Sequence, residues 1–188
     1  MIKLVILDRD GTINADSVDY IKTPDEWEPL PGALEAVARL NHAGWHVVVA
    51  SNQSGLGRGL FDVATLNAIH AKMHAQLAER GGRIDAIFFC PHTPEDGCHC
   101  RKPEPGLFEQ ISSRYGLDLH DVPVVGDSVR DLLAGVAVGC QPHLVLSGKS
   151  AACRGRELPP DMPANTQVHE DLAAFVEHWL QRPLAAAS

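Results

Sequence analysis

Apolar residues gather in five short runs along the chain. Each run is rich in Val, Ile or Leu and is closed by turn-forming residues. A continuous apolar run of this length is typical of a strand buried on both faces of a parallel sheet. The pattern therefore predicts five buried strands, at residues 2–8, 45–52, 84–91, 122–128 and 142–148.

Segments compatible with helices separate these runs, and a further one follows the last run. The alternation of strand and helix favours the α/β class, with a doubly wound (Rossmann-like) parallel sheet. The chain shows no internal repeat, low-complexity linker or domain boundary, so residues 1–188 are expected to form a single domain. The predicted helices lie at residues 32–43, 62–80, 104–116, 128–138 and 170–181.

Two segments interrupt this alternation. Residues 11–31 are too polar and contain too much proline for a simple strand-to-helix connection, and we expect them to form a flap or loop over the sheet edge after the first strand. Residues 90–103, CPHTPEDGCHCRKP, form a loop that contains three of the five cysteines.

Composition narrows the class of ligand. The chain has 188 residues, of which 45% are hydrophobic and 21% charged, as in an ordinary soluble domain. Its formal charge of −8 disfavours non-specific binding to nucleic acid or to an anionic membrane. No stretch approaches the roughly 20 apolar residues of a membrane span, and the acidic start MIKLVILDRD does not resemble a signal peptide. We therefore expect a cytoplasmic protein with a small-molecule partner, without nucleic-acid or membrane partners.

Two aspartates follow the first apolar run directly. Asp8 and Asp10 lie in the stretch VILDRDGTIN, and two interpretations are open. They could cap a helix or close a turn, since Asp-Gly favours turns. Alternatively, they form a catalytic pair at the carboxyl end of a parallel strand, where open α/β sheets place their sites.

Other polar residues fall at the same edge of the predicted sheet. Ser51 and Asn52 end the second run, Asp127 ends the fourth, and Lys102 precedes the third helix. A crevice with carboxylates, a hydroxyl, an amide and an ammonium suits phosphoryl transfer. One carboxylate can attack phosphorus and a second can exchange protons, while a divalent cation offsets the repulsion between anions. Oxygen ligands favour Mg²⁺ as that cation.

Four motifs resemble, in order and spacing, those of the haloacid dehalogenase (HAD) superfamily of phosphatases. They are DRDGT, SNQSG, RKPEPG and GDSVRD, and the resemblance spans about residues 3–148. It implies that Asp8 is the nucleophile, Asp10 the general acid/base, and Ser51 and Lys102 the residues that stabilise the phosphoryl group. It also implies a catalytic Mg²⁺ held by Asp8, Asp127 and the main-chain carbonyl of Asp10.

One position departs from the superfamily pattern. A second acid or a lysine often follows the Gly-Asp of the last motif, whereas this chain has Ser128. Metal coordination beyond Asp127 is left open by the sequence, with Asp131, one helical turn on, as a possible helper outside the first ligand shell.

The cysteine loop offers a second metal site. Cys90, His92, Cys98 and Cys100 have the spacing C-x-H-x5-C-x-C. Three thiolates and one imidazole make a closed tetrahedral set with no position for water, which is typical of structural zinc. We predict a structural Zn²⁺ that staples the loop; the alternative is a chance cluster of reduced cysteines.

Zinc loops of this kind occur in a narrower group of HAD phosphatases, which includes histidinol-phosphate phosphatases and D-glycero-D-manno-heptose 1,7-bisphosphate phosphatases. The chain most resembles the latter, through SNQSGLGRG, CPH and CRKPEPG. That resemblance implies hydrolysis of the C7 phosphate of a sugar bisphosphate, in the synthesis of lipopolysaccharide core precursors. Arg58 and Arg101 could bind the second phosphate, whereas they would be poor neighbours for the cationic histidinol phosphate, which is the alternative substrate.

The resemblance also implies further substrate contacts from the flap and from the second strand end. Solvated loop is the alternative for each flap residue. The alternative to an enzyme is a small zinc-binding interaction module, which the acidic charge of the chain disfavours. We expect the protein to be a monomer. His70 and His74, at i and i+4, lack the glutamate of an HExxH motif and are interpreted as surface residues. The expected substrate contacts are Asp16, Ser17, Val18, Asp19, Asn52, Gln53 and Ser54.

Overall fold

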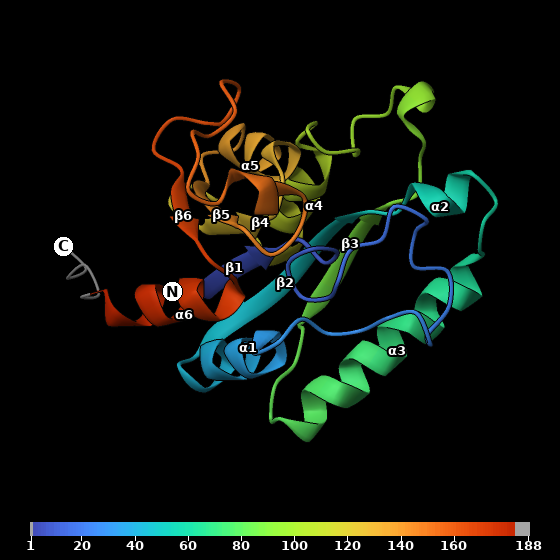
Figure 1. The fold of residues 1–188 in the computed structure, drawn as a ribbon, viewed down its shortest axis with the longest axis horizontal. Coiled ribbons are helices and arrows are strands. Elements are labelled where there is room, and N and C mark those ends of the chain that lie inside the picture. The colour runs from blue at the N-terminus through green and yellow to red at the C-terminus, as the bar shows by residue number, and fades with distance from the viewer. Residues whose placement is uncertain (1, 183–188) are drawn as a thin grey trace.

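Six strands form one all-parallel sheet in the computed structural model, which describes residues 2–182 (Figure 1). Their order across the sheet is β3-β2-β1-β4-β5-β6. The prediction of one domain over residues 1–188 also included residue 1 and residues 183–188, which lie outside the described part. The strands are β1 (Lys3–Leu7), β2 (Trp45–Asn52), β3 (Ala86–Cys90), β4 (Pro123–Gly126), β5 (Gln141–Val145) and β6 (Gln167–His169).

Helices connect most of the strands, and their ends carry recognisable caps. The Asp62 carboxylate accepts a hydrogen bond from the Thr65 N–H at the start of α3, and Asp171 caps α6 in the same way at Ala174. Every helix within residues 2–182 is too short or too polar to cross a lipid bilayer. The α-helices are α1 (Ala33–His42), α2 (Ser54–Gly57), α3 (Val63–Glu79), α4 (Gly106–Tyr115), α5 (Val129–Val136) and α6 (Leu172–Gln181), and the 3₁₀ turns are η1 (Pro94–Asp96) and η2 (Lys149–Cys153).

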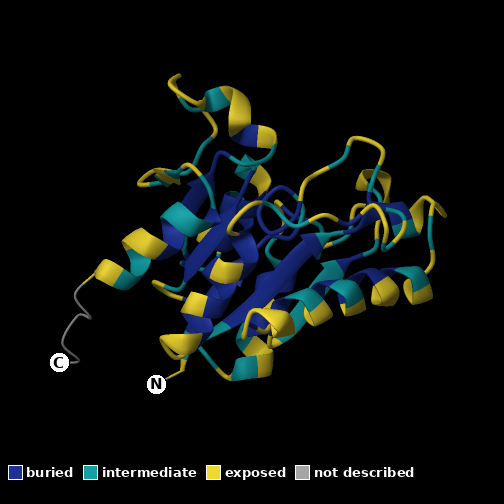
Figure 2. Cartoon of the chain, turned by 60° about the horizontal axis from the view of Figure 1, so that its bottom comes forward, coloured by how far each residue is buried: buried dark blue, intermediate teal, exposed yellow. Residues whose placement is uncertain are grey.

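The sheet separates two hydrophobic cores. Alternate residues of β1 point to opposite faces: Val5 and Leu7 pack with α1, α3 and α6, while Leu4 and Ile6 pack with α4 and α5. Figure 1 shows these helices in two layers on either side of the strands, and Figure 2 shows the strands as the buried centre. This arrangement confirms the doubly wound parallel sheet.

The strand order reverses between β1 and β4. The chain builds β1, β2 and β3 outward in one direction, then returns to pair β4 with the other side of β1. Ile6 pairs with Val124 and Leu7 with Val125, so Asp8 and Asp127 leave neighbouring strands at the same edge. A reversal of this kind opens a crevice at the carboxyl ends of the strands, where ligands bind in open α/β sheets.

Two features differ from the sequence prediction. The strand β6 is not predicted, because its three residues are partly or fully exposed and carry no apolar run. The predicted flap over residues 11–31 is only partly a flap. Ile13, Ile21 and Trp27 are buried in the core beside α1 and α3, so this polar segment is anchored at three apolar points.

Candidate active site

Lys102 and Asp8 form the centre of the site. The Lys102 Nζ lies 2.8 Å from Asp8 Oδ1 and 2.6 Å from Asp131 Oδ1, and it donates a hydrogen bond to the carbonyl of Ala50 at 2.7 Å. Lys102 is only 2% exposed. Three acceptors of this kind compensate for the burial of an ammonium group and fix its position beside Asp8. The carboxylates hold the pKa of Lys102 above its usual range although burial opposes this, so the side chain is charged.

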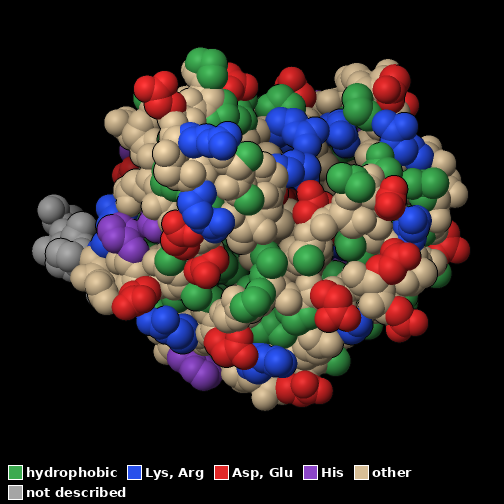
Figure 3. Space-filling model, in the orientation of Figure 1, with side chains coloured by type: hydrophobic (Ala, Val, Ile, Leu, Met, Phe, Trp, Pro, Cys, Tyr) green, Lys and Arg blue, Asp and Glu red, His purple; other side chains and the backbone are tan. Residues whose placement is uncertain are grey.

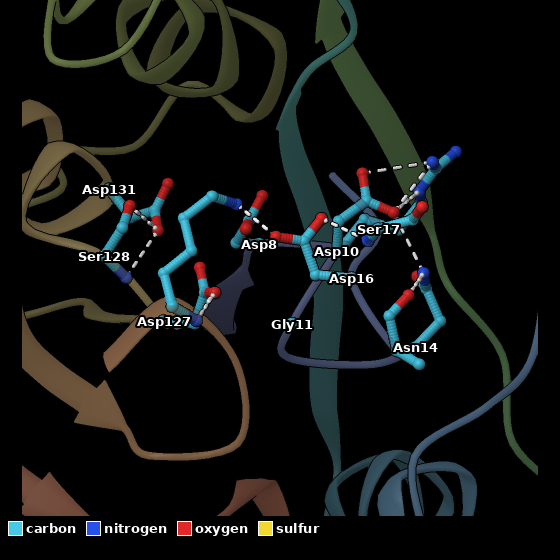
Figure 4. Close-up of polar contacts among 12 residues, drawn as sticks. Asp8, Asp10, Gly11, Asn14, Asp16, Ser17, Asp127, Ser128 and Asp131 are labelled. Atoms are coloured by element: carbon cyan, nitrogen blue, oxygen red, sulfur yellow. Dashed lines mark hydrogen bonds and ion pairs between the residues drawn. The ribbon is translucent and has the colours of Figure 1, made fainter. Parts of the chain in front are cut away.

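Three carboxylates face one space at this edge of the sheet. Oxygens of Asp8, Asp127 and Asp131 lie within 4.8 Å of one another, and Figure 4 shows the three side chains converging. Asp127 Oδ2 accepts the N–H of Lys149 at 2.6 Å, whereas Asp127 Oδ1 is buried and has no hydrogen-bond partner within residues 2–182. A buried carboxylate oxygen without a partner, beside two other carboxylates, fits a divalent cation such as Mg²⁺.

Glycines make room for this cluster. Gly11 has φ 83°, and a Cβ at Gly11 or at Gly148 would overlap with the carboxylate of Asp127. A Cβ at Gly126 would likewise overlap with Asp131. Any larger residue at these positions would displace the carboxylates, because the backbone approaches them directly.

The three carboxylates repel one another. Burial, followed by Asp131, raises the pKa of Asp8 to about 8, although Lys102 opposes the rise. Burial and Asp131 also raise the pKa of Asp127 to about 6. Asp131 shows the opposite shift: burial would raise its pKa, but Lys102 and Ser128 hold it below the usual range. Ser128 donates its hydroxyl to Asp131 Oδ2 at 2.6 Å and so orients that carboxylate.

Asp10 is held by donors on both of its oxygens. The guanidinium of Arg9 donates through Nε and Nη2 at 2.9–3.1 Å, Asn14 Nδ2 donates at 2.9 Å, and Gln53 Nε2 donates at 2.9 Å. Burial raises the pKa of Asp10, but Arg9 and these hydrogen bonds outweigh it and hold that pKa below its usual range. The carboxylate of Asp10 is therefore ionised in the free protein, and these donors fix its position two residues after Asp8.

The end of β2 contacts the segments that carry Asp10 and Lys102. Ser51 is buried and its hydroxyl accepts from Gln53 Nε2 at 2.7 Å. The amide of Asn52 makes two hydrogen bonds of 3.0 Å with the backbone of Lys102, one to its carbonyl and one from its N–H. Asn52 thereby ties the segment that carries Lys102 to the sheet.

A cavity of about 350 Å³ lies over these residues. Most of the predicted site residues line it. Within residues 2–182, the predicted catalytic residue Ser51 and the predicted substrate contacts Asp19 and Arg58 are not among the lining residues. The predicted residues in the lining are Asp8, Asp10, Asp16, Ser17, Val18, Asn52, Gln53, Ser54, Arg101, Lys102 and Asp127.

Cationic side chains border the cavity. Figure 3 shows Lys and Arg side chains gathered beside a recess in this face of the molecule. The cavity is lined by Arg101, Lys102, Arg130 and Lys149. Arg130 and Lys149 are not among the site residues predicted from the sequence, although Arg130 lies three residues after Asp127. Lys149 forms an ion pair with Asp16 of the flap and so links the flap to the loop after β5.

The Cys/His loop brings its four donors together. The sulfur atoms of Cys90, Cys98 and Cys100 lie 3.1–3.7 Å apart, and His92 Nδ1 lies 3.5 Å from Cys90 Sγ and 3.3 Å from Cys100 Sγ. A zinc ion with Zn–S bonds of about 2.3 Å separates its sulfur ligands by about 3.8 Å in a tetrahedron. The four donors therefore fit zinc, with Nδ1 as the ligand atom of His92.

Two residues have larger roles in the site than the sequence predicted. Asp131 belongs to the carboxylate cluster itself and pairs with Lys102. His70 was interpreted as a surface residue, and that interpretation is wrong: it is 7% exposed, with Nε2 3.2 Å from Arg9 Nη1, while His74 is exposed. Burial and Arg9 lower the pKa of His70 to about 4. The i, i+4 spacing could not distinguish the two histidines, because only the packing of α3 decides which faces inward.

Comparison with known proteins gives consistent matches. The family model HAD-hydrolase-like matches residues 99–175. A D-glycero-beta-D-manno-heptose-1,7-bisphosphate 7-phosphatase from Bordetella bronchiseptica is 58% identical over 95% of this chain and 98% of that protein. A protein of the same name from Pseudomonas aeruginosa is 53% identical over 95% of this chain and 98% of that protein.

A solved structure matches the fold closely. The crystal structure of D,D-heptose 1,7-bisphosphate phosphatase from B. bronchiseptica, complexed with magnesium and phosphate, superposes with a TM-score of 0.91 at 57% identity. The match covers 96% of this chain and 99% of that one. The B. bronchiseptica relative and this solved structure each align with nearly the whole chain, so the alignments include the sheet edge, the flap and the Cys/His loop.

Proposed function

The chain belongs to the family of D-glycero-beta-D-manno-heptose-1,7-bisphosphate 7-phosphatases, within the HAD superfamily, and on that premise we propose that it removes the C7 phosphate of this sugar and leaves the C1 phosphate in place. The observation that carries the proposal is the contact of Lys102 with Asp8, beside the carboxylates of Asp127 and Asp131. This arrangement presents a nucleophile, a fixed cation and a place for a divalent metal on one side of the cavity.

The reaction proceeds in two steps. An oxygen of Asp8 attacks phosphorus, and the bond between phosphorus and the C7 oxygen breaks. Asp10, which is ionised in the free protein, takes up a proton when the phosphate dianion enters the site and gives that proton to the leaving oxygen. Water then attacks the aspartyl phosphate while Asp10 accepts a proton from it, which releases phosphate and restores Asp8. Lys102 and the hydroxyl of Ser51 hold phosphoryl oxygens during both steps.

Asp8, Asp127 and the main-chain carbonyl of Asp10 would hold Mg²⁺, with Asp131 close enough to contribute directly or through water. The partnerless oxygen of Asp127 and the mutual repulsion of these carboxylates fit such an ion. When bound, Mg²⁺ supplies positive charge that keeps Asp8 ionised and polarises the phosphoryl group.

The Cys/His loop acts as a structural element. Cys90, His92, Cys98 and Cys100 would hold Zn²⁺ in a closed set, which leaves no position for a reacting water. The loop leads directly into Arg101 and Lys102, so an ordered loop places the catalytic lysine. Zinc is thus expected to support catalysis through folding.

The second phosphate of the substrate meets the cationic rim of the cavity. Arg101 lies next to Lys102, and its guanidinium makes one hydrogen bond within residues 2–182, to the carbonyl of His92 at 3.3 Å. Arg101 and Arg130 form no ion pair with a carboxylate among residues 2–182. On a chain of charge −8, two such arginines are suited to a distal dianion. Asp16, Ser17 and Val18 of the flap, with Gln53 and Ser54, would contact the sugar between the phosphates.

The test is a comparison of kcat/KM on the heptose bisphosphate, a heptose monophosphate and histidinol phosphate. Arg101→Ala should lower kcat/KM for the bisphosphate by about 10–150-fold, since a charged hydrogen bond contributes roughly 1.5–3 kcal/mol. The monophosphate, which lacks the distal group, should be almost unaffected. Arg58→Ala is the matched control, because Arg58 does not line the cavity, and it should change neither substrate by more than about twofold. Histidinol phosphate as the better wild-type substrate would overturn the proposal.

A further inference from the structure

Arg9 is a buried cation that the mechanism above does not use. It lies between Asp8 and Asp10 in sequence and is 0% exposed. Within residues 2–182, the guanidinium contacts the side chains of three residues. Nε and Nη2 donate to Asp10, Nη2 also donates to Gln53 Oε1 at 3.4 Å, and Nη1 lies 3.2 Å from His70 Nε2.

A merely structural role does not account for this arrangement well. Burying a charged pair costs desolvation energy that the ion pair only partly recovers, and apolar side chains of similar volume commonly stabilise a fold as well or better. The pair also lies at the sheet edge beside the nucleophile, where Asp10 borders the cavity. A buried guanidinium with its donors arranged around one catalytic carboxylate therefore indicates that the orientation of this carboxylate matters.

His70 extends the contact to a helix. A guanidinium can only donate hydrogen bonds, so His70 Nε2 must be the acceptor, which places the ring proton on Nδ1. His70 lies in α3 between Ile69 and Met73, which are both 0% exposed and anchor the helix in the core. The ring thus holds the free end of the guanidinium against a rigid element.

We propose that Arg9 and His70 are positioning residues for Asp10: Arg9 fixes the carboxylate, and His70 fixes Arg9. The inference rests on the proposed function, in which Asp10 protonates the leaving oxygen. Arg9 supplies three of the five donor contacts on the two carboxylate oxygens, and Asn14 and Gln53 supply the other two. Without Arg9 the carboxylate can turn away from the leaving group, because the remaining donors hold only one contact on each oxygen.

The leaving group provides the test. A sugar alkoxide needs a proton as it departs, whereas 4-nitrophenolate is a stable anion that leaves without one. In the full chain with Mg²⁺ and zinc present, Arg9→Met should lower kcat/KM on the heptose bisphosphate by about 10–100-fold, as misplacement of a catalytic group by about 1 Å typically does. On 4-nitrophenyl phosphate the same variant should lose less than about threefold. His70→Phe should show the same selectivity with a smaller loss, and KM should change little in both variants.

Conservative variants and a matched control complete the experiment. Arg9→Lys keeps the charge but cannot contact both oxygens and His70, so we expect an intermediate loss. His70→Gln keeps an acceptor and should recover part of the activity of His70→Phe. His74→Phe changes the neighbouring histidine of the same helix, which is exposed, and should match wild type. If Arg9→Met does not fold, the Arg9→Lys and His70 variants carry the comparison.

Equal losses on the two substrates would overturn the proposal, because general damage to the site affects both leaving groups alike. A loss for His70→Phe that persists undiminished in the Arg9→Lys background would also contradict it, since His70 is argued to act through Arg9. If wild type cleaves 4-nitrophenyl phosphate and a hexose phosphate but not the heptose bisphosphate, the proposed substrate is wrong. The hexose phosphate then takes the place of the heptose in the comparison, which still decides the roles of Arg9 and His70.

Discussion

The carboxylate cluster and the Cys/His loop are both suited to metal ions, yet they are assembled in opposite ways. Asp8, Lys102, Asp127 and Asp131 come from three separate segments of the chain, with Asp8 and Lys102 lying 94 positions apart, and are at most 8% exposed. The four donors of the loop lie within eleven residues, and only Cys90 is buried. The first site exists because the sheet brings strand ends together, and the second because one short segment turns back on itself.

The energetics of the two regions differ accordingly. Two hydrophobic cores stabilise the sheet, and the sheet holds three carboxylates close together although they repel one another. The loop has little core of its own, so it depends on the metal for its shape. A catalytic cluster can therefore destabilise the fold that forms it, whereas a structural metal site stabilises the segment that binds it. The two regions meet at Lys102, which follows the last cysteine of the loop and reaches Asp8.

The largest expected effect is the removal of the nucleophile. Asp8→Asn should lower kcat by at least about 10⁴-fold, because an amide cannot form the acyl phosphate. The same variant should unfold at an equal or higher temperature without Mg²⁺, because it removes a repelling charge. Rapid acid quench with labelled substrate and thermal unfolding measure the two effects.

Asp10→Asn is the control for that prediction. It should retain Mg²⁺ and substrate binding and lose about 10²–10⁴-fold in rate, as expected for the loss of proton transfer. A phosphoryl group trapped on a residue other than Asp8 would contradict the role of Asp8 as nucleophile. A clear destabilisation of Asp8→Asn would contradict the difference in stability that we infer between the two regions.

A smaller effect is expected in the loop. Cys98→Ser or Cys100→Ser should lose about one zinc per chain by metal analysis and lower the melting temperature by about 5–10 °C, which corresponds to about 2–3 kcal/mol for a chain of this size. Activity should fall as a consequence, because Lys102 is attached to the loop.

Cys153→Ser is the matched control, since Cys153 lies outside the zinc set, and it should retain the metal. Should zinc removal stop turnover at once while the melting temperature stays unchanged, the loop would be catalytic and the contrast between the sites would be wrong.

The smallest effect is a dependence of stability on pH that belongs to the carboxylate cluster alone. The pKa of Asp8 is about 8 in the folded protein, above the value of about 3.9 in an unfolded chain. The folded state therefore binds more protons than the unfolded state between these values, and stability falls as pH rises through this range. In zinc-loaded protein without Mg²⁺, the contribution of Asp8 to the free energy of unfolding should fall by about 1–2 kcal/mol between pH 6.5 and 8.

The buried histidines act in the opposite direction. Burial lowers the pKa of His143 to about 3 and those of His70 and His169 to about 4, so their contribution to stability rises with pH until the unfolded histidines are neutral, at about pH 7.5. The measurement is therefore the difference between wild type and Asp8→Asn in chemical denaturation across the window. The stability of Asp8→Asn should not fall, that of wild type relative to the variant should fall, and Mg²⁺ should remove this difference in slope. Parallel slopes in the two proteins would rule out Asp8 as the source.

The sequence alone determined the class of the fold and much of both sites. Continuous apolar runs predict buried parallel strands because such strands are covered on both faces, and this held for five of the six strands of the described chain. The carboxyl ends of those strands share one edge, so Asp8, Asp10 and Asp127 could be placed together from their positions in the chain. The zinc ligands could be found because their spacing is local.

The tertiary structure alone decided what depends on distance and packing. The β6 strand carries too few buried residues to leave a pattern, and Ile13 and Trp27 are buried in a segment whose composition suggested a flap. The ion pair of Lys102 with Asp131, and the contact of His70 with Arg9, join residues 29 and 61 positions apart. Hydrophobic periodicity records only how deeply a residue is buried, and it does not record which buried polar groups meet. For that reason the charges that hold Asp8 and Asp10 in place became visible only when the sheet, the loop and α3 were seen together.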